Sequence, residues 1–214
     1  MQHAAAHRLI AALSSFTPIL AALPSISEKV VGPCKFQTFG ADDATRKIAD
    51  CAKIPIGVEY VFIHEIERTI SIDFGGGTAA ELMNQFAQQA PEYSWKDDGT
   101  VIHVFQKAAH VPIADVLMAY PGAQQKTRQE IWEDIQNRPE INRWMETFRC
   151  DRQELMSGTE FSQNNDRITV EPGQLTLAQL LDAVIIKSGD NHWVISLSRP
   201  RRPGDTCKIT IFLW

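Results

Sequence analysis

The chain has 214 residues, which at about 150 residues per domain corresponds to one domain or two small ones. Its 21 lysines and arginines against 26 aspartates and glutamates give a net charge of −5 with neutral histidines. This acidic balance, without a basic stripe, argues against a protein that binds nucleic acid through its phosphates. Hydrophobic residues make up 44% of the chain, which excludes disorder and predicts a globular fold with a sizeable core.

Residues 1–27 resemble a secretory signal peptide. Met1–Arg8 is weakly basic, Leu9–Leu23 is largely apolar, and Ser25 and Ser27 are small residues suited to a cleavage site before Glu28. The apolar run is too short to span a bilayer. The alternative is a folded N-terminal helix, because large apolar residues recur at three- and four-residue intervals. The first interpretation predicts a periplasmic or secreted protein, and the second predicts a cytoplasmic one.

The four cysteines, Cys34, Cys51, Cys150 and Cys207, are widely spaced and show no zinc-ligand pattern. In an exported protein they could form two disulfides, for which three pairings exist. The pairing to test first joins the cysteines within each half of the chain, Cys34 with Cys51 and Cys150 with Cys207. In the cytosol, all four would be buried free thiols.

An internal repeat is the most informative feature of the sequence. A shift of 98 residues aligns Ile70–Lys96 with Ile168–Val194 without a gap. Identical residues occupy six aligned positions: Ile70/Ile168, Gly75/Gly173, Thr78/Thr176, Ala80/Ala178, Leu82/Leu180 and Trp95/Trp193. The matching residue types favour strand, turn, helix-cap and core positions.

The first copy predicts a strand, a helix and a hairpin. Ile70–Phe74 alternates apolar and polar residues, as in a half-buried strand, and Gly75–Gly77 interrupts it. Thr78 can cap a helix that ends before Pro91. Asp98–Gly99 then provides a two-residue hairpin turn between two apolar-rich segments.

The second copy predicts the same elements. Ile168–Val170 is the strand, Thr176 caps the helix, and Gly189–Asp190 ends it. Trp193–Leu197 and Cys207–Leu213 form the hairpin strands, joined by a longer turn.

A βαβ-like segment precedes each unit. In the first half its strand, helix and strand are Lys35–Phe39, Asp42 or Asp43 to Cys51, and Ile56–Phe62. In the second half a strand and two helices are Val111–Met118, Gln124–Gln136 and Pro139–Phe148. The sequence therefore predicts an α+β fold with two similar halves, residues 28–107 and 108–214, whose helices pack on small sheets.

The strand–Gly–x–x–Thr–helix–hairpin pattern of Ile70–Phe105 and Ile168–Ser196 resembles the short N-terminal (STN) domain of secretins and TonB-dependent receptors. Ile54–Glu59 and Pro91–Trp95 also resemble uncharacterised exported bacterial proteins with repeated STN-like domains. The resemblance implies a location in the cell envelope and a docking role. It rests on structural positions and brings no catalytic residue with it.

Motifs with a chemical meaning are weak in this sequence. Gly75–Gly77 before a helix could cradle a phosphate, but it lacks the lysine and the spacing of known phosphate loops, so a turn is the better interpretation. His64–Glu65 has Arg68 in place of the second histidine of a zinc protease. No serine lies in a Gly-x-Ser-x-Gly frame. We therefore expect no catalytic residue, cofactor or metal site.

Trp95 and Trp193 occupy equivalent positions of the repeat and have two interpretations. They could be platforms on which a sugar or a peptide stacks. Their repetition favours hairpin residues that pack on the helix of their own unit.

These observations lead to one functional hypothesis and two alternatives. The hypothesis is a non-catalytic interaction module of the cell envelope that binds a protein partner through sheet edges or the groove between the halves. It predicts no nucleic-acid partner, and membrane association only through the export machinery or an envelope partner. The alternatives are an enzyme or small-ligand receptor with a site between the halves, and a cytosolic scaffold.

Overall fold

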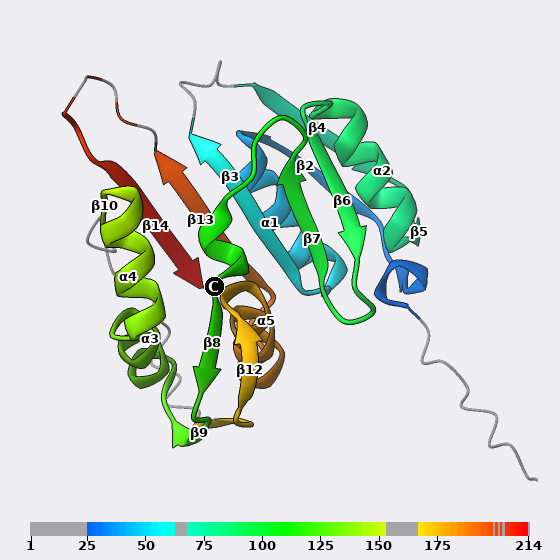
Figure 1. Cartoon of the computed structure of the whole chain (residues 1–214). Helices are drawn as coiled ribbons and strands as arrows, with labels where there is room; N and C mark the ends of the chain where they lie inside the picture. Colours follow the sequence, from blue (N-terminus) through cyan, green and yellow to red (C-terminus); the bar gives the residue numbers. More distant parts are fainter. Residues whose placement is uncertain are drawn as a thin grey trace, which may run out of the picture.

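The computed structural model describes residues 25–62, 68–152, 167–198, 200, 202 and 204–213. Its helices and sheets of mixed strands confirm the predicted α+β class (Figure 1). The proposed signal segment lies outside the described residues up to position 24, and so do His64 and Glu65. Among the helices that the structure describes, none is long and apolar enough to cross a membrane.

A six-stranded sheet runs through the centre of the molecule (Figure 1). Its strands, in spatial order, are β10 (Cys150–Arg152), β14 (Cys207–Leu213), β13 (His192–Ser198), β3 (Ile56–Phe62), β7 (Ile102–Gln106) and β6 (Tyr93–Asp97). The hairpins β6–β7 and β13–β14 are antiparallel, whereas β3 is parallel to both of its neighbours, β7 and β13. The pairing of β13 with β3 joins the two predicted halves in one sheet.

Four antiparallel strand pairs lie outside this sheet. They are β1 (Val30–Val31) with β5 (Gly77–Thr78), β2 (Cys34–Phe39) with β4 (Thr69–Phe74), β8 (Leu117–Tyr120) with β12 (Gly173–Thr176), and β9 (Ala123–Lys126) with β11 (Ile168–Val170). In each half, a strand pair therefore links the βαβ-like segment to the start of the repeated unit.

Five α-helices and two short 3-10 helices are described: α1 (Ala41–Ala52), α2 (Ala79–Gln89), α3 (Arg128–Gln136), α4 (Pro139–Phe148), α5 (Leu177–Ser188), η1 (Ile26–Glu28) and η2 (Pro112–Asp115). Thr78 and Thr176 cap α2 and α5, as predicted, and each forms a reciprocal capping box with the third helical residue, Glu81 or Gln179. For α1, however, the prediction of an Asp42 or Asp43 cap is wrong. The helix begins at Ala41, and its cap is Gly40 with a φ of 79°.

Two hydrophobic clusters lie on opposite faces of the central sheet. Successive side chains of a strand point to opposite faces. Trp193 and Ile195 of β13 accordingly belong to the cluster that includes α3, α4 and α5, whereas Val194 belongs to the cluster that includes α1 and α2. Each cluster draws most of its residues from one predicted half. The sheet is shared by strands of both predicted halves, so residues from the two parts of the chain pack around one sheet.

The repeated segments form corresponding elements in the same order. We call β4, β5, α2, β6 and β7 the first unit, and β11, β12, α5, β13 and β14 the second unit. In each half, a three-stranded part of the sheet has the order crossover strand, second hairpin strand, first hairpin strand, namely β3–β7–β6 and β10–β14–β13. The crossover strand is parallel to its neighbour in both parts.

Two local predictions were wrong in the second half. Within Val111–Met118 the structure has η2 followed by the start of β8. The helix expected from Gln124 begins only at Arg128, because β9 pairs with β11 and Thr127 caps the helix with Glu130.

The glycines Gly75 and Gly173, which are identical in the repeat, have no positive φ and no close contact that would exclude a side chain. In the first unit, the left-handed turn residues are instead Gly76 and Gly77, with φ of 108° and 150°. The shared glycine is therefore not required by the backbone geometry at that position.

The cysteines are paired within each half. Cys34–Cys51 links β2 to the end of α1, and Cys150–Cys207 links β10 to the start of β14. The two bonds do not occupy equivalent positions of the repeat. Two disulfides in a chain of this size are compatible with a protein that folds outside the reducing cytosol.

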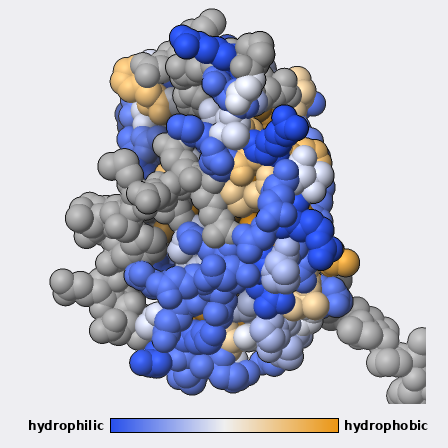
Figure 2. Space-filling view, turned by 60° about the vertical axis from the view of Figure 1, so that its left-hand side comes forward, coloured by the Kyte–Doolittle hydropathy of each residue, from blue (hydrophilic) through white to orange (hydrophobic). Residues whose placement is uncertain are grey.

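The face of the molecule that Figure 2 shows is polar in its lower part. Figure 2 brings the left-hand side of Figure 1 forward, and its lower part is mostly hydrophilic with smaller hydrophobic patches above. Most exposed residues of α4 are polar, namely Asn142, Arg143, Glu146 and Thr147, although Phe148 at its end is 54% exposed; Ile141 and Met145 are buried.

Candidate functional site at the sheet edge

Trp193 lies where β13 and α5 of the second predicted half meet β3 and β7 of the first half, a region we call the junction. Its side chain is fully buried, and its indole Nε1 donates a hydrogen bond to Asp182 Oδ1 on α5 at 2.7 Å. Beside it, β3 pairs with β13 in a parallel ladder that runs from His192↔Ile56 to Ser198↔Phe62. The tryptophan thus packs on the helix of its own unit and on a strand of the other half.

Gly57 of β3 lies directly opposite Trp193 in this ladder. A Cβ atom at Gly57 would lie 2.2 Å from Cζ2 and 2.3 Å from Cε2 of the Trp193 ring. These distances are far below van der Waals contact, so the indole lies across a strand position that accepts only glycine.

Trp95 makes the equivalent hydrogen bond to the helix of its own unit, but different residues surround it. Its indole Nε1 donates to Asn84 Oδ1 on α2 at 3.2 Å, and Asn84 precedes Asp182 by the 98 residues of the repeat. Both tryptophans therefore hold the helix of their own unit, which supports the packing interpretation. Trp95 is only half-buried, because β6 is the last strand on its side of the sheet as the structure describes it.

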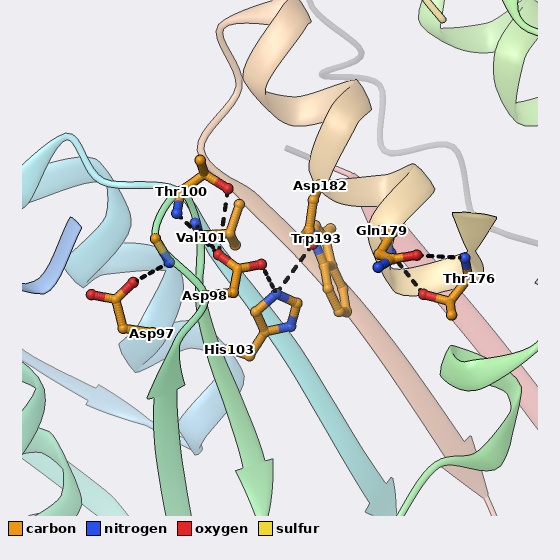
Figure 3. Close-up of polar contacts among 10 residues, drawn as sticks. Asp97, Asp98, Thr100, Val101, His103, Thr176, Gln179, Asp182 and Trp193 are labelled. Atoms are coloured by element: carbon orange, nitrogen blue, oxygen red, sulfur yellow. Dashed lines mark hydrogen bonds and ion pairs between the residues drawn. The ribbon is translucent and has the colours of Figure 1, made fainter. Parts of the chain in front are cut away.

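A polar cluster closes the junction next to Trp193 (Figure 3). His103 of β7 has its Nε2 3.1 Å from Asp182 Oδ2 and 3.2 Å from Asp98 Oδ2 in the β6–β7 turn. Asp98 also accepts backbone N–H bonds from Thr100 and Val101, which fix the turn. His103 and Asp182 are both 6% exposed, so this charge contact between the halves lies almost out of water.

The opposite face of the junction carries a second histidine. His192, the first residue of β13, is fully buried, and its Nε2 lies 3.1 Å from Thr45 Oγ1 on α1. Burial lowers the pKa of His192 to about 3, so its ring stays neutral at physiological pH. Contacts between side chains thus join the two halves on both faces of the sheet.

His103 is expected to make junction stability depend on pH. Burial opposes its charge, but the hydrogen bond and charge of Asp182 and the charge of Asp98 outweigh this, so its pKa is raised. The stabilisation is fully present below the unfolded pKa of about 6.5 and is lost as pH rises through the raised folded value. We expect urea unfolding between pH 5.5 and 9 to give the wild type a larger free energy of unfolding than His103→Gln at acidic pH, by on the order of 1 kcal/mol. This gap should shrink towards pH 9, and a gap that grows with pH would contradict the ion-pair assignment.

The same cluster has the donor types of a metal site. Asp98, His103 and Asp182 offer two carboxylate oxygens and a ring nitrogen within 4.8 Å of one another. Asp182 already accepts from Trp193, and a metal would need a deprotonated His103, whereas its raised pKa favours the imidazolium. We therefore assign the cluster a structural role, and the expectation that the chain uses no metal stays a prediction.

An open pocket of about 480 Å³ lies beside β3 and β7 near η2. Its ionisable lining residues are Glu59, Lys96, Lys107, His110 and Asp115. Burial raises the pKa of Glu59, and His110 and Asp115 form an exposed pair with 2.8 Å between Nε2 and Oδ2. The pocket lining comes from both predicted halves, because Glu59 and Lys96 lie before residue 108 and His110 and Asp115 lie after it.

Sequence reasoning identified the tryptophans and the threonine caps but missed their partners. Asn84 and Asp182 are polar residues at equivalent positions of the two repeated helices, and that coincidence could have marked them. Gly57 and His103 carry no such sequence signal, because each acquires its role only when the halves dock.

Comparison of the chain with protein-family models and with curated protein sequences gave no match.

Proposed function

We propose that this chain is a non-catalytic binding module of the cell envelope that takes up an extended segment of a partner protein along β6. Two disulfides and a signal-like N-terminal sequence support a location outside the cytosol. The STN-like pattern of the repeat supports a docking role.

One observation carries the proposal. β13 and β6 are the equivalent strands of the two units, and β13 is covered by β3 through a seven-residue parallel ladder. Among the described strands, β6 has β7 on one side and forms the edge of the sheet on the other. The molecule therefore contains one copy of this strand edge that is paired with another strand and one copy, on β6, that has no strand beside it among the described residues. At the end of β6 the Asp97 carboxylate accepts hydrogen bonds from Ser25 Oγ and Ser27 N.

The register shows which backbone groups the open edge presents. Lys107 N donates to Glu92 O, and Asp98 N to Val101 O, so the alternation of the antiparallel ladder pairs Ser94 and Lys96 with β7. The N–H groups of Trp95 and Asp97 consequently point outward. Such groups can complete a ladder with an added strand, while the exposed charge of Lys96 disfavours indiscriminate edge pairing.

The test uses a synthetic peptide with the β3 sequence, Ile-Gly-Val-Glu-Tyr-Val-Phe, flanked by lysines for solubility. We expect it to bind the full disulfide-bonded chain, as measured by fluorescence anisotropy of a label on the peptide. In the filled ladder Ile56 N donates to Asn191 O, so the first, third and fifth peptide residues face the protein strand.

N-methylation provides the matched control. A methyl group on the amide of the third residue, the counterpart of Val58, should abolish binding, whereas one on the second residue, the counterpart of Gly57, should leave it intact. Absence of binding, or equal binding of both methylated peptides, would overturn the proposal.

A further inference from the structure

Both tryptophans hydrogen-bond to the helix of their own unit, and this shared contact predicts the direction of the Trp95 ring. Each starts from the first hairpin strand and reaches the helix residue eleven positions earlier in the sequence, Asn84 for Trp95 and Asp182 for Trp193. In the second unit this geometry carries the indole past its own strand and over Gly57 of β3. The same geometry in the first unit carries the Trp95 ring past the open side of β6.

The difference in burial fits this placement. Trp193 is 0% exposed where β3 covers its edge, and Trp95 is half-buried where the edge is open. Trp95 also packs against the hydrophobic cluster of α1 and α2, so its position does not depend on a bound strand. A strand added beside β6 would thus meet an indole that is already in place.

We propose that the strand bound by β6 carries a glycine opposite Trp95, and that Trp95 is the specificity-determining residue of this edge. The inference rests on the function proposed above. By the same geometry, a side chain opposite Trp95 would collide with its ring, as a Cβ at Gly57 would collide with the Trp193 ring. Trp95 therefore selects for glycine by steric exclusion while its ring covers the backbone of the bound strand.

The occupant is a segment of a separate protein. A second copy of this chain could offer either end of its own six-stranded sheet, β6 or β10, and neither strand contains a glycine. The described residues of β10 are Cys150, Asp151 and Arg152, which include no glycine, and Cys150 is held in a disulfide. The end strands of the central sheet of a second copy thus lack the residue that the Trp95 edge requires, and pairing through a shorter glycine-containing strand such as β12 (Gly173–Thr176) is the outcome that sedimentation tests.

The experiment compares three peptides of the β3 sequence that carry glycine, alanine or valine at the second position. Wild type should bind the alanine peptide about tenfold more weakly than the glycine peptide, or worse, and the valine peptide more weakly still. The Trp95→Ala variant should bind all three within about twofold of one another, because the excluding ring is gone.

Trp144→Ala is the matched control. Trp144 is also half-buried, but it stacks on Phe148 in α4 and packs against the other hydrophobic cluster. This variant should keep the wild-type preference for glycine. Far-UV circular dichroism and thermal unfolding verify that both variants are folded.

The outcomes separate the two proposals. Equal binding of all three peptides by wild type, with the N-methyl dependence intact, would overturn the role of Trp95 and leave strand binding in place. A glycine preference that persists in Trp95→Ala would also overturn it. Failure of every peptide to bind would overturn strand binding itself. Sedimentation of the chain alone should show a monomer, and a dimer that the glycine peptide dissociates would identify a second copy as the occupant.

Discussion

Replacing Gly57 by alanine is expected to lower the free energy of unfolding by about 3 kcal/mol or more. The added Cβ would lie 2.2 Å from the fully buried Trp193 ring, which is held to Asp182 and has no room to withdraw. Such overpacking forces the ring from its hydrogen bond or separates β3 from β13. Urea denaturation of the disulfide-bonded protein, followed by tryptophan fluorescence, measures the change.

Two variants make this result specific. Gly75→Ala introduces the same methyl group where nothing lies within 4 Å, and it should leave stability within about 0.5 kcal/mol of wild type. Trp193→Phe should recover part of the loss when combined with Gly57→Ala, because the smaller ring leaves space for the methyl group. If Gly57→Ala has the same free energy of unfolding as the wild type, the Trp193 indole does not pack over β3 as described.

Removal of the Cys150–Cys207 disulfide is expected to produce the other large effect. Its partners are separated by 57 residues and those of Cys34–Cys51 by 17, so the first bond restricts the unfolded chain more. In the chain-entropy treatment, the free energy of unfolding should fall by about 4 kcal/mol in Cys150→Ser/Cys207→Ser. It should fall by about 3 kcal/mol in Cys34→Ser/Cys51→Ser. Denaturant unfolding of both variants against wild type tests the order. A larger loss for Cys34→Ser/Cys51→Ser would show that local packing, and not loop length, sets these contributions.

Elements with strong local signals could be predicted from the sequence. The Asp98–Gly99 turn, the Thr78 and Thr176 caps, and the helix Pro139–Phe148 depend on residues within a few positions of one another. Their conformations are therefore favoured before any distant contact forms.

Elements that depend on distant partners could not be predicted in this way. β9 forms because it pairs with β11, and its residues alone resemble the start of a helix. The parallel pairing of β3 with β13 is likewise invisible in either segment, since an apolar strand sequence does not show which other strand it pairs with.

The candidate site shows the same division. The repeat pointed to Trp95 and Trp193 as equivalent residues, and their contacts with Asn84 and Asp182 agree with that equivalence. The feature that distinguishes them, a strand with a glycine beside one and an open edge beside the other, arises only from the docking of the two halves.

Amide hydrogen exchange, resolved by residue with NMR, tests most directly whether β6 is the open counterpart of β13. In the free protein the backbone amides of Trp95 and Asp97 should exchange quickly, while those of Trp193 and Ile195 should exchange only on global unfolding. Adding the glycine-containing β3 peptide should protect Trp95 and Asp97 and leave the β13 amides unchanged. Slow exchange at Trp95 and Asp97 in the free protein, or no added protection with saturating peptide, would contradict the account.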